Sequence, residues 1–321
     1  MTSTFVTPFI AEDLKILRKH WEVEHLLVHG VAALPSILRG VRRSDVVYTW
    51  FASTYAAPAV AAARAFGRRS VIAIGGGDVA GIPEIGYGIW ISPWKSRLVS
   101  YALKTADRII AVDPFLKQEA IRRAAYDGGN IEVLPTGYDS VFWSPGGEQS
   151  DSVLTVAVCE SEARLRVKGL DLLLEAARRL PGTHFLIVGL QEPYASGLRS
   201  KAPANVEIRG RVSPEEVRSL YRKSRVYCQP SRFEGLPNSV CEAMLCGCVP
   251  VGTDVGGMRT PVDGYGLLVP WGDPAALAEA ISKAMAAPPG AGLKGRESIA
   301  SRFTQERREQ GLVQLIGGIA G

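Results

Sequence analysis

The sequence predicts an α/β protein with two doubly wound domains, each built on a parallel sheet. Short apolar runs rich in Val, Ile and Leu alternate with segments of helical periodicity along most of the chain. Continuous apolar strands separated by helices are typical of parallel sheets that helices cover on both faces. The alternation occurs twice, on either side of a stretch rich in Pro, Gly and Ser at residues 139–152. Six expected strands in each half favour two domains over one very wide sheet.

The expected strands share a short length and a mostly apolar composition. Those of the first half lie at residues 3–7, 23–29, 46–51, 70–76, 107–113 and 131–137. Those of the second half lie at residues 153–159, 184–189, 206–210, 225–230, 249–253 and 266–270. One helical face joins Leu170, Leu173, Leu174, Ala177 and Leu180, and another joins Val240, Ala243, Met244 and Gly247.

The polar stretch between the halves and a second Pro/Gly-rich patch set the expected domain boundaries. We expect a first domain over residues 1–145, a second over residues 146–295, and a C-terminal helix over residues 296–321 that packs back on the first domain. In open α/β sheets, ligands bind outside the carboxyl ends of the strands. We therefore expect the two domains to face each other across a cleft, with the chemistry in loops that follow strands.

Composition and charge restrict the function. The chain has 321 residues, 46% of them apolar, and a net charge of +5 without any Lys/Arg block of the kind that marks a nucleic-acid-binding stripe. No run approaches the ~18 apolar residues of a membrane span, and the start MTSTFVTPF is not that of a signal peptide. Five cysteines, an odd number in mostly apolar surroundings, suit a reducing cytoplasm.

Two glutamates stand out in PSRFEGLPNSVCEAMLCGCVPV, residues 230–251. Ser239-x-x-Glu242 fits a capping box, which would explain Glu242 without any function. Glu234 has no such structural duty, because it lies in a Gly/Pro loop directly after an expected strand. Backbone N–H groups near a helix N-terminus favour an anion, and carboxylates beside them can accept hydrogen bonds from sugar hydroxyls. The combination points to a sugar nucleotide.

Three more segments carry polar or aromatic residues beside expected strand ends. Arg164, Arg166 and Lys168 suit a diphosphate, or form a solvated charged loop. The glycines of AIGGGD, before Asp78, let backbone approach a ligand or form a tight loop, and they lack dinucleotide-binding spacing. Residues 87–104 mix tryptophans and Tyr101 with basic residues, which suits a membrane-surface helix or an ordinary core helix with a basic outer face.

The cysteines do not predict a metal site. Cys241, Cys246 and Cys248 have neither a C-x-x-C pair nor a neighbouring His, so we interpret them as small packing residues. The chain also has no Asp-x-Asp element that could hold a nucleotide diphosphate through a metal ion. Basic side chains and helix N-termini would then bind the diphosphate. We expect no metal and no cofactor besides the nucleotide sugar used as substrate.

The stretch PSRFEGLPNSVCEAMLCGCVPVGTDVGG resembles the E-x7-E region of the family-4 retaining glycosyltransferases, which have the GT-B fold of two Rossmann-like domains. The resemblance extends through RLRVKGLDLLLEAARRLPGTHFLIVG, IRGRVSPEEVRSLYRKSRVY and DGYGLLVPWGDPAALAEAI, and in the first half through ADRIIAVDPFLKQEA and IEVLPTGYDSVFWSP. It covers most of residues 100–285, whereas the first 100 residues match in general layout.

The resemblance implies a role for each matching residue. Catalysis would rest on Glu234, which contacts the donor sugar, and on Lys168 with Arg164 or Arg166 at the diphosphate. The donor would be bound by the backbone of Gly235, Leu236, Pro237 and Asn238, by Glu242 at the ribose, and by Gly210, Arg211 and Val212 along the base. Gly76, Gly77 and Asp78 would lie on the acceptor side. Transfer would be front-face and independent of metal.

Three departures from the family pattern concern the diphosphate and the acceptor. Glu162 stands where the family has an arginine before the KG lysine, the glycine-rich loop after the first strand is missing from FVTPFIAEDL, and GGGD replaces a histidine. The prediction is a cytoplasmic, retaining glycosyltransferase with a UDP- or GDP-sugar donor. Its acceptor would be a glycan, a lipid-linked molecule or a small molecule, with peripheral contact to the inner membrane face as a further option. The alternatives are a GT-B sugar-nucleotide epimerase and a non-catalytic sugar-nucleotide-binding protein.

Overall fold

The computed structural model describes residues 1–320, which form two compact units. Unit 1 contains residues 1–137 and the C-terminal segment that begins at Gln305, and unit 2 contains Tyr138–Thr304. The boundary lies before the Pro/Gly-rich stretch at 139–152. Residues 138–145 belong to unit 2 because the Arg296 guanidinium donates to the carbonyl of Ser140 and that of Arg222 donates to the carbonyl of Ser144.

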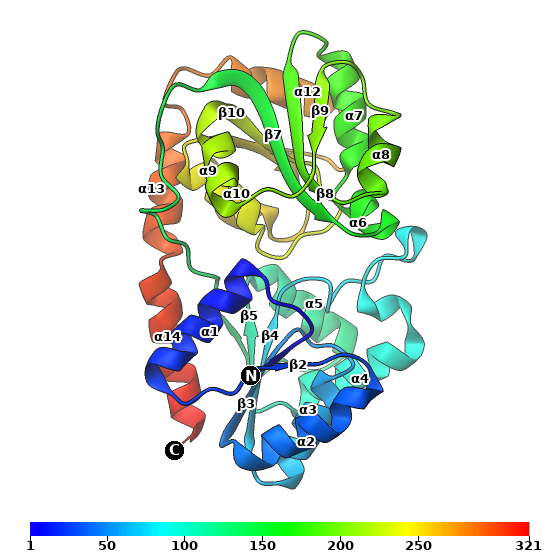
Figure 1. Cartoon of the computed structure of the whole chain (residues 1–321), viewed down its shortest axis with the longest axis vertical. Coiled ribbons are helices and arrows are strands. Elements are labelled where there is room, and N and C mark those ends of the chain that lie inside the picture. Colours follow the sequence, from blue (N-terminus) through cyan, green and yellow to red (C-terminus); the bar gives the residue numbers. More distant parts are fainter. Residues whose placement is uncertain (321) are drawn as a thin grey trace. The chain divides into compact units, whose positions relative to one another are not determined.

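Unit 1 is a parallel sheet in the order β2-β1-β3-β4-β5-β6, flanked by helices (Figure 1). Its strands are β1 (Thr2–Ser3), β2 (Leu26–Leu27), β3 (Val46–Trp50), β4 (Arg69–Ile74), β5 (Arg108–Ala111) and β6 (Ile131–Val133). Its α-helices are α1 (Pro8–His20), α2 (Leu34–Arg43), α3 (Ala56–Ala65), α4 (Pro93–Thr105), α5 (Pro114–Ala124) and α14 (Gln305–Ala320). Short 3₁₀ turns cover Val31–Ala33, Pro83–Ile85 and Ile89–Ile91.

Local sequence explains where several of these helices begin. Proline occupies the first helical position of α1, α4 and α5, where its fixed φ suits the helix and its missing N–H costs no hydrogen bond. Asp113 caps α5 by accepting a hydrogen bond from the Phe115 N–H at 2.8 Å. The C-terminal helix α14 packs on α1 and β4 within unit 1.

Unit 2 is a second parallel sheet, in the order β12-β11-β10-β7-β8-β9. Its strands are β7 (Ser150–Cys159), β8 (His184–Leu190), β9 (Val206–Arg209), β10 (Ser224–Gln229), β11 (Val249–Thr253) and β12 (Leu267–Val269). Its α-helices are α6 (Glu162–Val167), α7 (Leu170–Arg179), α8 (Tyr194–Arg199), α9 (Pro214–Lys223), α10 (Asn238–Leu245), α11 (Arg259–Val262), α12 (Pro274–Met285) and α13 (Leu293–Arg302), with a 3₁₀ turn at Gly256–Met258.

The strand order of unit 2 places its ligand-binding edge. Strand β7 comes first in the chain and pairs with β8 on one side and with β10 on the other. The order therefore reverses between β7 and β10. Ligands of doubly wound sheets bind at such a switch point, beside the carboxyl ends of the two strands. The segments that follow β7 and β10, which contain Lys168 and Glu234, meet at this edge.

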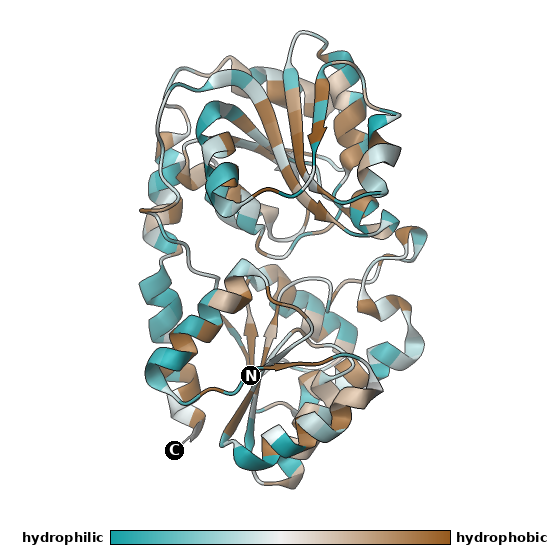
Figure 2. Ribbon diagram, in the orientation of Figure 1, coloured by the Kyte–Doolittle hydropathy of each residue, from teal (hydrophilic) through white to brown (hydrophobic). Residues whose placement is uncertain are grey.

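The hydrophobic cores follow the apolar strands and one face of each covering helix. In unit 2, Leu173 and Ala177 of α7, Phe185 and Ile187 of β8, and Ile281 of α12 are buried in one cluster. Figure 2 shows the strands of both sheets as predominantly hydrophobic, with hydrophilic residues spread over the outer helices. The predicted α/β fold with two doubly wound domains is confirmed, and each expected strand has its counterpart among β1–β12. No helix within residues 1–320 has both the length and the apolar composition needed to cross a membrane.

Candidate functional site

Lys168 and Glu234 meet at the carboxyl ends of β7 and β10. The Lys168 ammonium lies 2.6 Å from Glu234 Oε1, although the two residues are 66 positions apart. Both side chains are largely withdrawn from solvent, at 21% and 11% exposure. Lys168 lies at the end of α6, which follows β7, and Glu234 lies on the loop after β10, so the charged pair at the edge of the sheet is placed to contact a polar ligand.

Gly169 allows this approach. Its φ is +63°, a left-handed conformation that glycine adopts without steric cost. A Cβ added at Gly169 would lie 1.8 Å from the carbonyl oxygen of Pro230, so no side chain fits there. The neighbouring backbone is joined as well, because the Arg232 N–H donates to the carbonyl of Val167 at 2.7 Å. The Lys-Gly pair thus holds the loop of Lys168 against the end of β10.

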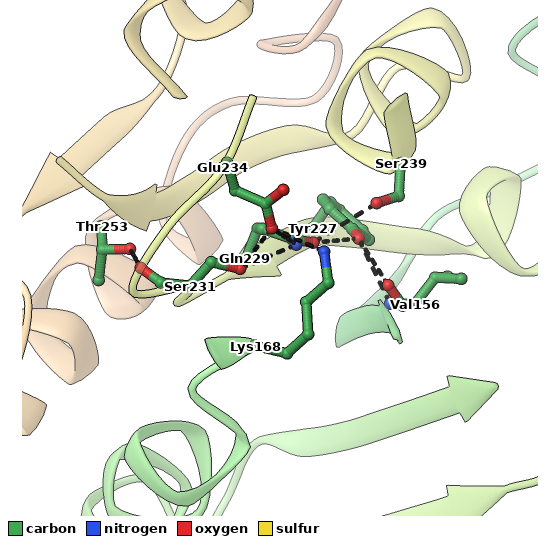
Figure 3. Close-up of polar contacts among 8 residues, drawn as sticks. All are labelled: Val156, Lys168, Tyr227, Gln229, Ser231, Glu234, Ser239 and Thr253. Carbon is green, nitrogen blue, oxygen red and sulfur yellow. Dashed lines mark hydrogen bonds and ion pairs between the residues drawn. The ribbon is translucent and has the colours of Figure 1, made fainter. Parts of the chain in front are cut away.

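Glu234 is held by three donors on one oxygen (Figure 3). Lys168, the side-chain amide of Gln229 at 2.7 Å and the hydroxyl of Ser231 at 2.6 Å all donate to Glu234 Oε1. Burial by itself raises the pKa of Glu234, but the Lys168 charge and these hydrogen bonds outweigh it and lower the pKa below its ordinary value. The carboxylate is therefore ionised, and its second oxygen takes part in none of these contacts.

Sequence reasoning missed Gln229 and Ser231. They stand in the stretch RVYCQPS, which reads as a buried strand followed by a turn. In the structure both side chains are buried, at 1% and 0% exposure. Gln229 could have been found from the sequence as a polar residue at the end of an otherwise apolar strand. A buried polar group needs a hydrogen-bond partner, so such a residue indicates a polar neighbour.

Glu242 lies on the first turns of α10, and the capping-box interpretation is wrong. Helix α10 begins at Asn238 after Pro237, so Ser239 lies inside the helix and caps nothing. Its hydroxyl instead donates to Gln229 Oε1 at 3.5 Å. Glu242 Oε2 accepts a hydrogen bond from the Tyr221 hydroxyl at 3.3 Å. Burial raises the pKa of Glu242 to about 8, against a smaller opposing effect of that hydrogen bond.

The two candidate arginines have different surroundings. Arg166, on the exposed side of α6, pairs with Glu162 at 3.3 Å. Burial raises the pKa of the Cys159 thiol, at the end of β7, to about 11. The positive charges of Lys168 and Arg164 both act on that thiol and oppose the rise. Arg166 thus forms a surface ion pair, and which of the two arginines accompanies Lys168 at the diphosphate stays a prediction.

The loop before α10 presents backbone at the same edge. Within residues 1–320, the N–H groups of Gly235 and Leu236 donate to no backbone carbonyl, although both residues are buried. Pro237 has no N–H, so it shapes the loop and donates nothing. The side-chain oxygen of Asn238 accepts a hydrogen bond from the Tyr138 hydroxyl at 2.6 Å. Of the four residues expected to bind the sugar nucleotide through their backbone, Pro237 therefore offers no N–H group.

Gly210, Arg211 and Val212 form the loop that follows β9. The Arg211 guanidinium pairs with Glu160, which lies just after β7. The Gly210 carbonyl accepts a hydrogen bond from the Gly189 N–H at 3.1 Å, near the end of β8. These contacts place the loop along the carboxyl edge of unit 2, and a role in binding the base stays a prediction.

The acceptor-side candidates lie in unit 1, directly after β4. Asp78 is buried, and its carboxylate accepts backbone hydrogen bonds from Gly76 at 2.7 Å, Ala52 at 3.1 Å and Gly75 at 3.2 Å. These three bonds give Asp78 a duty in holding the loop, and its acceptor role, too, stays a prediction. For Gly76 and Gly77 the acceptor role stays a prediction.

The cysteines are packing residues, as expected. All five are buried and unbridged. Within residues 1–320, no group of three or more His, Cys, Asp and Glu side chains is arranged to hold a metal ion.

Two family models match the chain, one for each half. Residues 154–287 match the model described as "Glycosyl transferases group 1", and residues 11–142 match the model "Glycosyltransferase Family 4". Together the two matches cover most of both units.

Curated relatives agree with these models. Alpha-maltose-1-phosphate synthase of Mycolicibacterium smegmatis is 28% identical over 253 residues, which are 69% of this chain and 65% of the relative. D-inositol 3-phosphate glycosyltransferase of the same organism is 28% identical over 62% of this chain and 50% of its own length. The chain thus spans less than two thirds of the length of these relatives.

Solved structures share the fold. The Anabaena HepE structure in complex with UDP-glucose superimposes with a TM-score of 0.76 at 17% identity, over 95% of this chain and 88% of that one. At that identity the likeness concerns the fold alone. Each half of the chain matches a glycosyltransferase model, and the solved structures share its fold of two Rossmann-like domains: the chain belongs to the family-4 glycosyltransferases and has the GT-B fold.

Proposed function

We propose that this protein is a retaining glycosyltransferase that moves a sugar from a UDP- or GDP-sugar to an acceptor hydroxyl without a metal ion. The observation that carries the proposal is the contact of Lys168 with Glu234 at the switch point of unit 2. It brings a cation for a diphosphate within 2.6 Å of a carboxylate for sugar hydroxyls. The family membership and the names of the curated relatives agree with transfer of a sugar.

Different residues of unit 2 bind different parts of the sugar nucleotide. Lys168 and Arg164 neutralise the diphosphate, while the N–H groups of Gly235 and Leu236 add hydrogen bonds to the sugar and phosphate oxygens. Glu242 binds the ribose hydroxyls. Glu234, ionised and held through Oε1, orients the transferred sugar with its other oxygen.

The reaction exchanges one bond at the anomeric carbon for another. The bond between that carbon and the diphosphate oxygen breaks, and the acceptor oxygen forms a new bond on the same face of the ring. The acceptor proton moves to the departing diphosphate oxygen. The positive charges of Lys168 and Arg164 stabilise the negative charge that develops there.

The exposed surface of α4 favours an acceptor presented at an anionic membrane. Trp94, Leu98 and Tyr101 lie at positions i, i+4 and i+7 and are all exposed, Trp94 at 58%. Arg97 and Lys104 flank them, and α4 has no acidic residue. An apolar face bordered by basic residues is typical of helices that lie in the membrane interface. Peripheral membrane contact through α4 and a cytoplasmic location belong to this proposal.

A panel of nucleotide diphosphates tests the donor site. UDP, GDP and ADP are each added to the protein in the presence of EDTA, and the melting temperature is measured. We expect UDP or GDP to raise it, since a ligand that binds only the folded state stabilises that state. No shift with any nucleotide would sink the donor-site assignment. Slow hydrolysis of the donor, with the product anomer identified, then separates a retaining transferase from an epimerase or from a protein that only binds.

Replacement of Glu234 by alanine tests the catalytic assignment. Glu234→Ala should lower transfer or donor hydrolysis by about 100-fold or more, because an interaction with the reacting sugar is lost. Nucleotide binding, measured by calorimetry, should persist, since the free nucleotide has no donor sugar. Glu162→Ala, which removes only the exposed partner of Arg166, is the control. Full activity of Glu234→Ala would refute its role.

A further inference from the structure

Gln229 is a fully buried amide at the end of β10, and both ends of its side chain are hydrogen-bonded (Figure 3). Its nitrogen Nε2 donates to Glu234 Oε1 at 2.7 Å and to the Ser231 hydroxyl at 3.0 Å. Its oxygen Oε1 accepts from the Tyr227 hydroxyl at 2.7 Å and from the Ser239 hydroxyl at 3.5 Å. No polar atom of this side chain is left without a partner.

Glu234 sets which way the amide points. An ionised carboxylate can only accept hydrogen bonds, so the amide nitrogen of Gln229 faces Glu234 and the amide oxygen faces Tyr227. Tyr227 is fully buried, and burial raises its pKa above the ordinary value, so the hydroxyl keeps its proton. That hydroxyl lies 2.7 Å from the Gln229 oxygen and 3.3 Å from the Val156 carbonyl, so the shorter of its two contacts supports the oxygen end of the amide.

The orientation of the Gln229 amide matters because Lys168 has two roles, one toward Glu234 and one toward the diphosphate. Glu234 Oε1 accepts hydrogen bonds from Lys168, Gln229 and Ser231. Under the proposed function Lys168 also binds the diphosphate, and its share in holding Glu234 then falls. Gln229 and Ser231 are the neutral donors that keep the carboxylate ionised and oriented.

We propose that Gln229 is a positioning residue for Glu234: by donating to Oε1 it turns Oε2 toward the donor sugar. This proposal rests on the proposed function. A neutral donor is required at this position. An apolar side chain in place of Gln229 would deprive the buried Glu234 carboxylate of one hydrogen bond. An ionised carboxylate in place of Gln229 would repel the negative charge of Glu234.

Kinetics of Gln229→Leu and Tyr227→Phe test the positioning role. Because a hydrogen bond to a charged group is lost, we expect kcat for donor turnover to fall about 10- to 100-fold in Gln229→Leu, with little change in UDP affinity. Tyr227→Phe should give a smaller fall in kcat, since it removes only a hydrogen bond to the oxygen end of the amide. Thr155→Val is the matched control: it removes a buried hydrogen bond to the Cys228 carbonyl, 2.7 Å long, that does not reach Glu234.

The pH profile of Gln229→Glu gives a readout that a merely structural role would not move. At low pH the introduced carboxyl is protonated and can donate to Glu234 as the amide does. As the pH rises it ionises and repels Glu234, so kcat should be close to that of the wild type near pH 5 and fall about tenfold or more by pH 8. A profile parallel to that of the wild type, or unchanged kcat in Gln229→Leu, overturns the proposal.

A measurement without substrate separates this inference from the proposed function. The pKa of Glu234 is measured by NMR with carboxyl-labelled glutamate, and its signal is assigned from Glu234→Gln. Loss of the Gln229 donor should raise that pKa by about 1 in Gln229→Leu, and Thr155→Val should leave it unchanged. If the wild type turns over no sugar nucleotide, the proposed function fails, while an unchanged pKa in Gln229→Leu would refute the positioning role alone.

Discussion

Glu234 and Glu242 carry the same functional group in one unit, and their surroundings shift their pKa values in opposite directions. Burial raises both. Glu234 has the Lys168 ammonium and two neutral donors, Gln229 and Ser231, on one oxygen, and together they more than compensate for burial. Glu242 has a single weak hydrogen bond from Tyr221. A cation within hydrogen-bond distance is therefore what keeps Glu234 ionised at neutral pH.

The raised pKa of Glu242 predicts a pH-dependent stability. The folded protein holds the Glu242 proton up to about pH 8, whereas the unfolded chain releases it near the ordinary value of 4.5. Since the folded state binds the extra proton in that range, the wild type loses stability as the pH rises from about 4.5 to about 8. In Glu242→Gln the side chain at this position does not titrate, so this loss of stability does not occur. The melting temperature of this variant relative to the wild type should rise over the same range and level off above it.

The control for this prediction is Glu279→Gln, on the exposed face of α12, where Glu279 pairs only with Lys283. Its melting temperature relative to the wild type should stay nearly constant between pH 5 and pH 8. A Glu242→Gln difference that is equally flat would show that Glu242 ionises normally in the folded protein.

At the scale of elements, one glycine sets the distance between two loops. Gly169 lies between α6 and α7, and its positive φ lets the chain turn directly against the end of β10. The sequence pattern points to the lysine of this Lys-Gly pair, whereas the need for the glycine follows from the Pro230 carbonyl beside it.

Gly169→Ala should destabilise unit 2 by more than about 1 kcal/mol, because alanine is disfavoured at positive φ and its Cβ would overlap the Pro230 carbonyl. The substitution should also weaken UDP binding, since Lys168 is adjacent. Chemical denaturation and calorimetry measure the two effects. Gly182→Ala is the control, because its Cβ would meet no atom within 4 Å and its φ is not positive. Equal stability of the two variants would contradict this account.

Helix α4 predicts salt-sensitive binding to anionic vesicles. In a sedimentation assay with phosphatidylglycerol vesicles, Lys104→Gln should lower the partition coefficient about fivefold, since each cation near such a surface contributes about 1 kcal/mol. Trp94→Ser should lower it further through lost apolar burial, and added salt should weaken binding of the wild type. Val141→Ser, at an apolar side chain 84% exposed, is the control. If neither α4 substitution changes vesicle binding, α4 is not the membrane-contacting helix.

At the scale of the whole molecule, the two ends of the chain belong to the same unit. Arg308 of α14 is buried against Asp13 of α1, with guanidinium-to-carboxylate distances of 2.9 and 2.7 Å. Tyr48 and Trp50 of β3 donate to the same carboxylate. This network ties the C-terminal helix into unit 1, although unit 2 separates it from the rest of unit 1 in sequence.

Arg308→Leu should destabilise unit 1 by about 3–5 kcal/mol, because it leaves the Asp13 charge buried without a cation. The double variant Asp13→Leu/Arg308→Leu should regain part of that loss. Scanning calorimetry with and without UDP follows the two units, since UDP should stabilise only unit 2. Lys19→Met, which breaks an exposed pair with Glu309 between the same two helices, should change little. An Arg308→Leu effect as small as that of Lys19→Met would contradict the role of the buried pair.

The sequence by itself determined the two sheets, the order of their elements and the loop that contains Glu234, because apolar periodicity and turn residues are local signals. It also identified Lys168, Glu234 and Glu242. Only the tertiary structure decided that the Lys168 ammonium contacts Glu234, that Asp78 supports its own loop, and that Gln229 is bonded to Glu234. Each of these depends on which strand ends are neighbours and on how deeply a polar atom is buried, and neither is encoded in a local pattern.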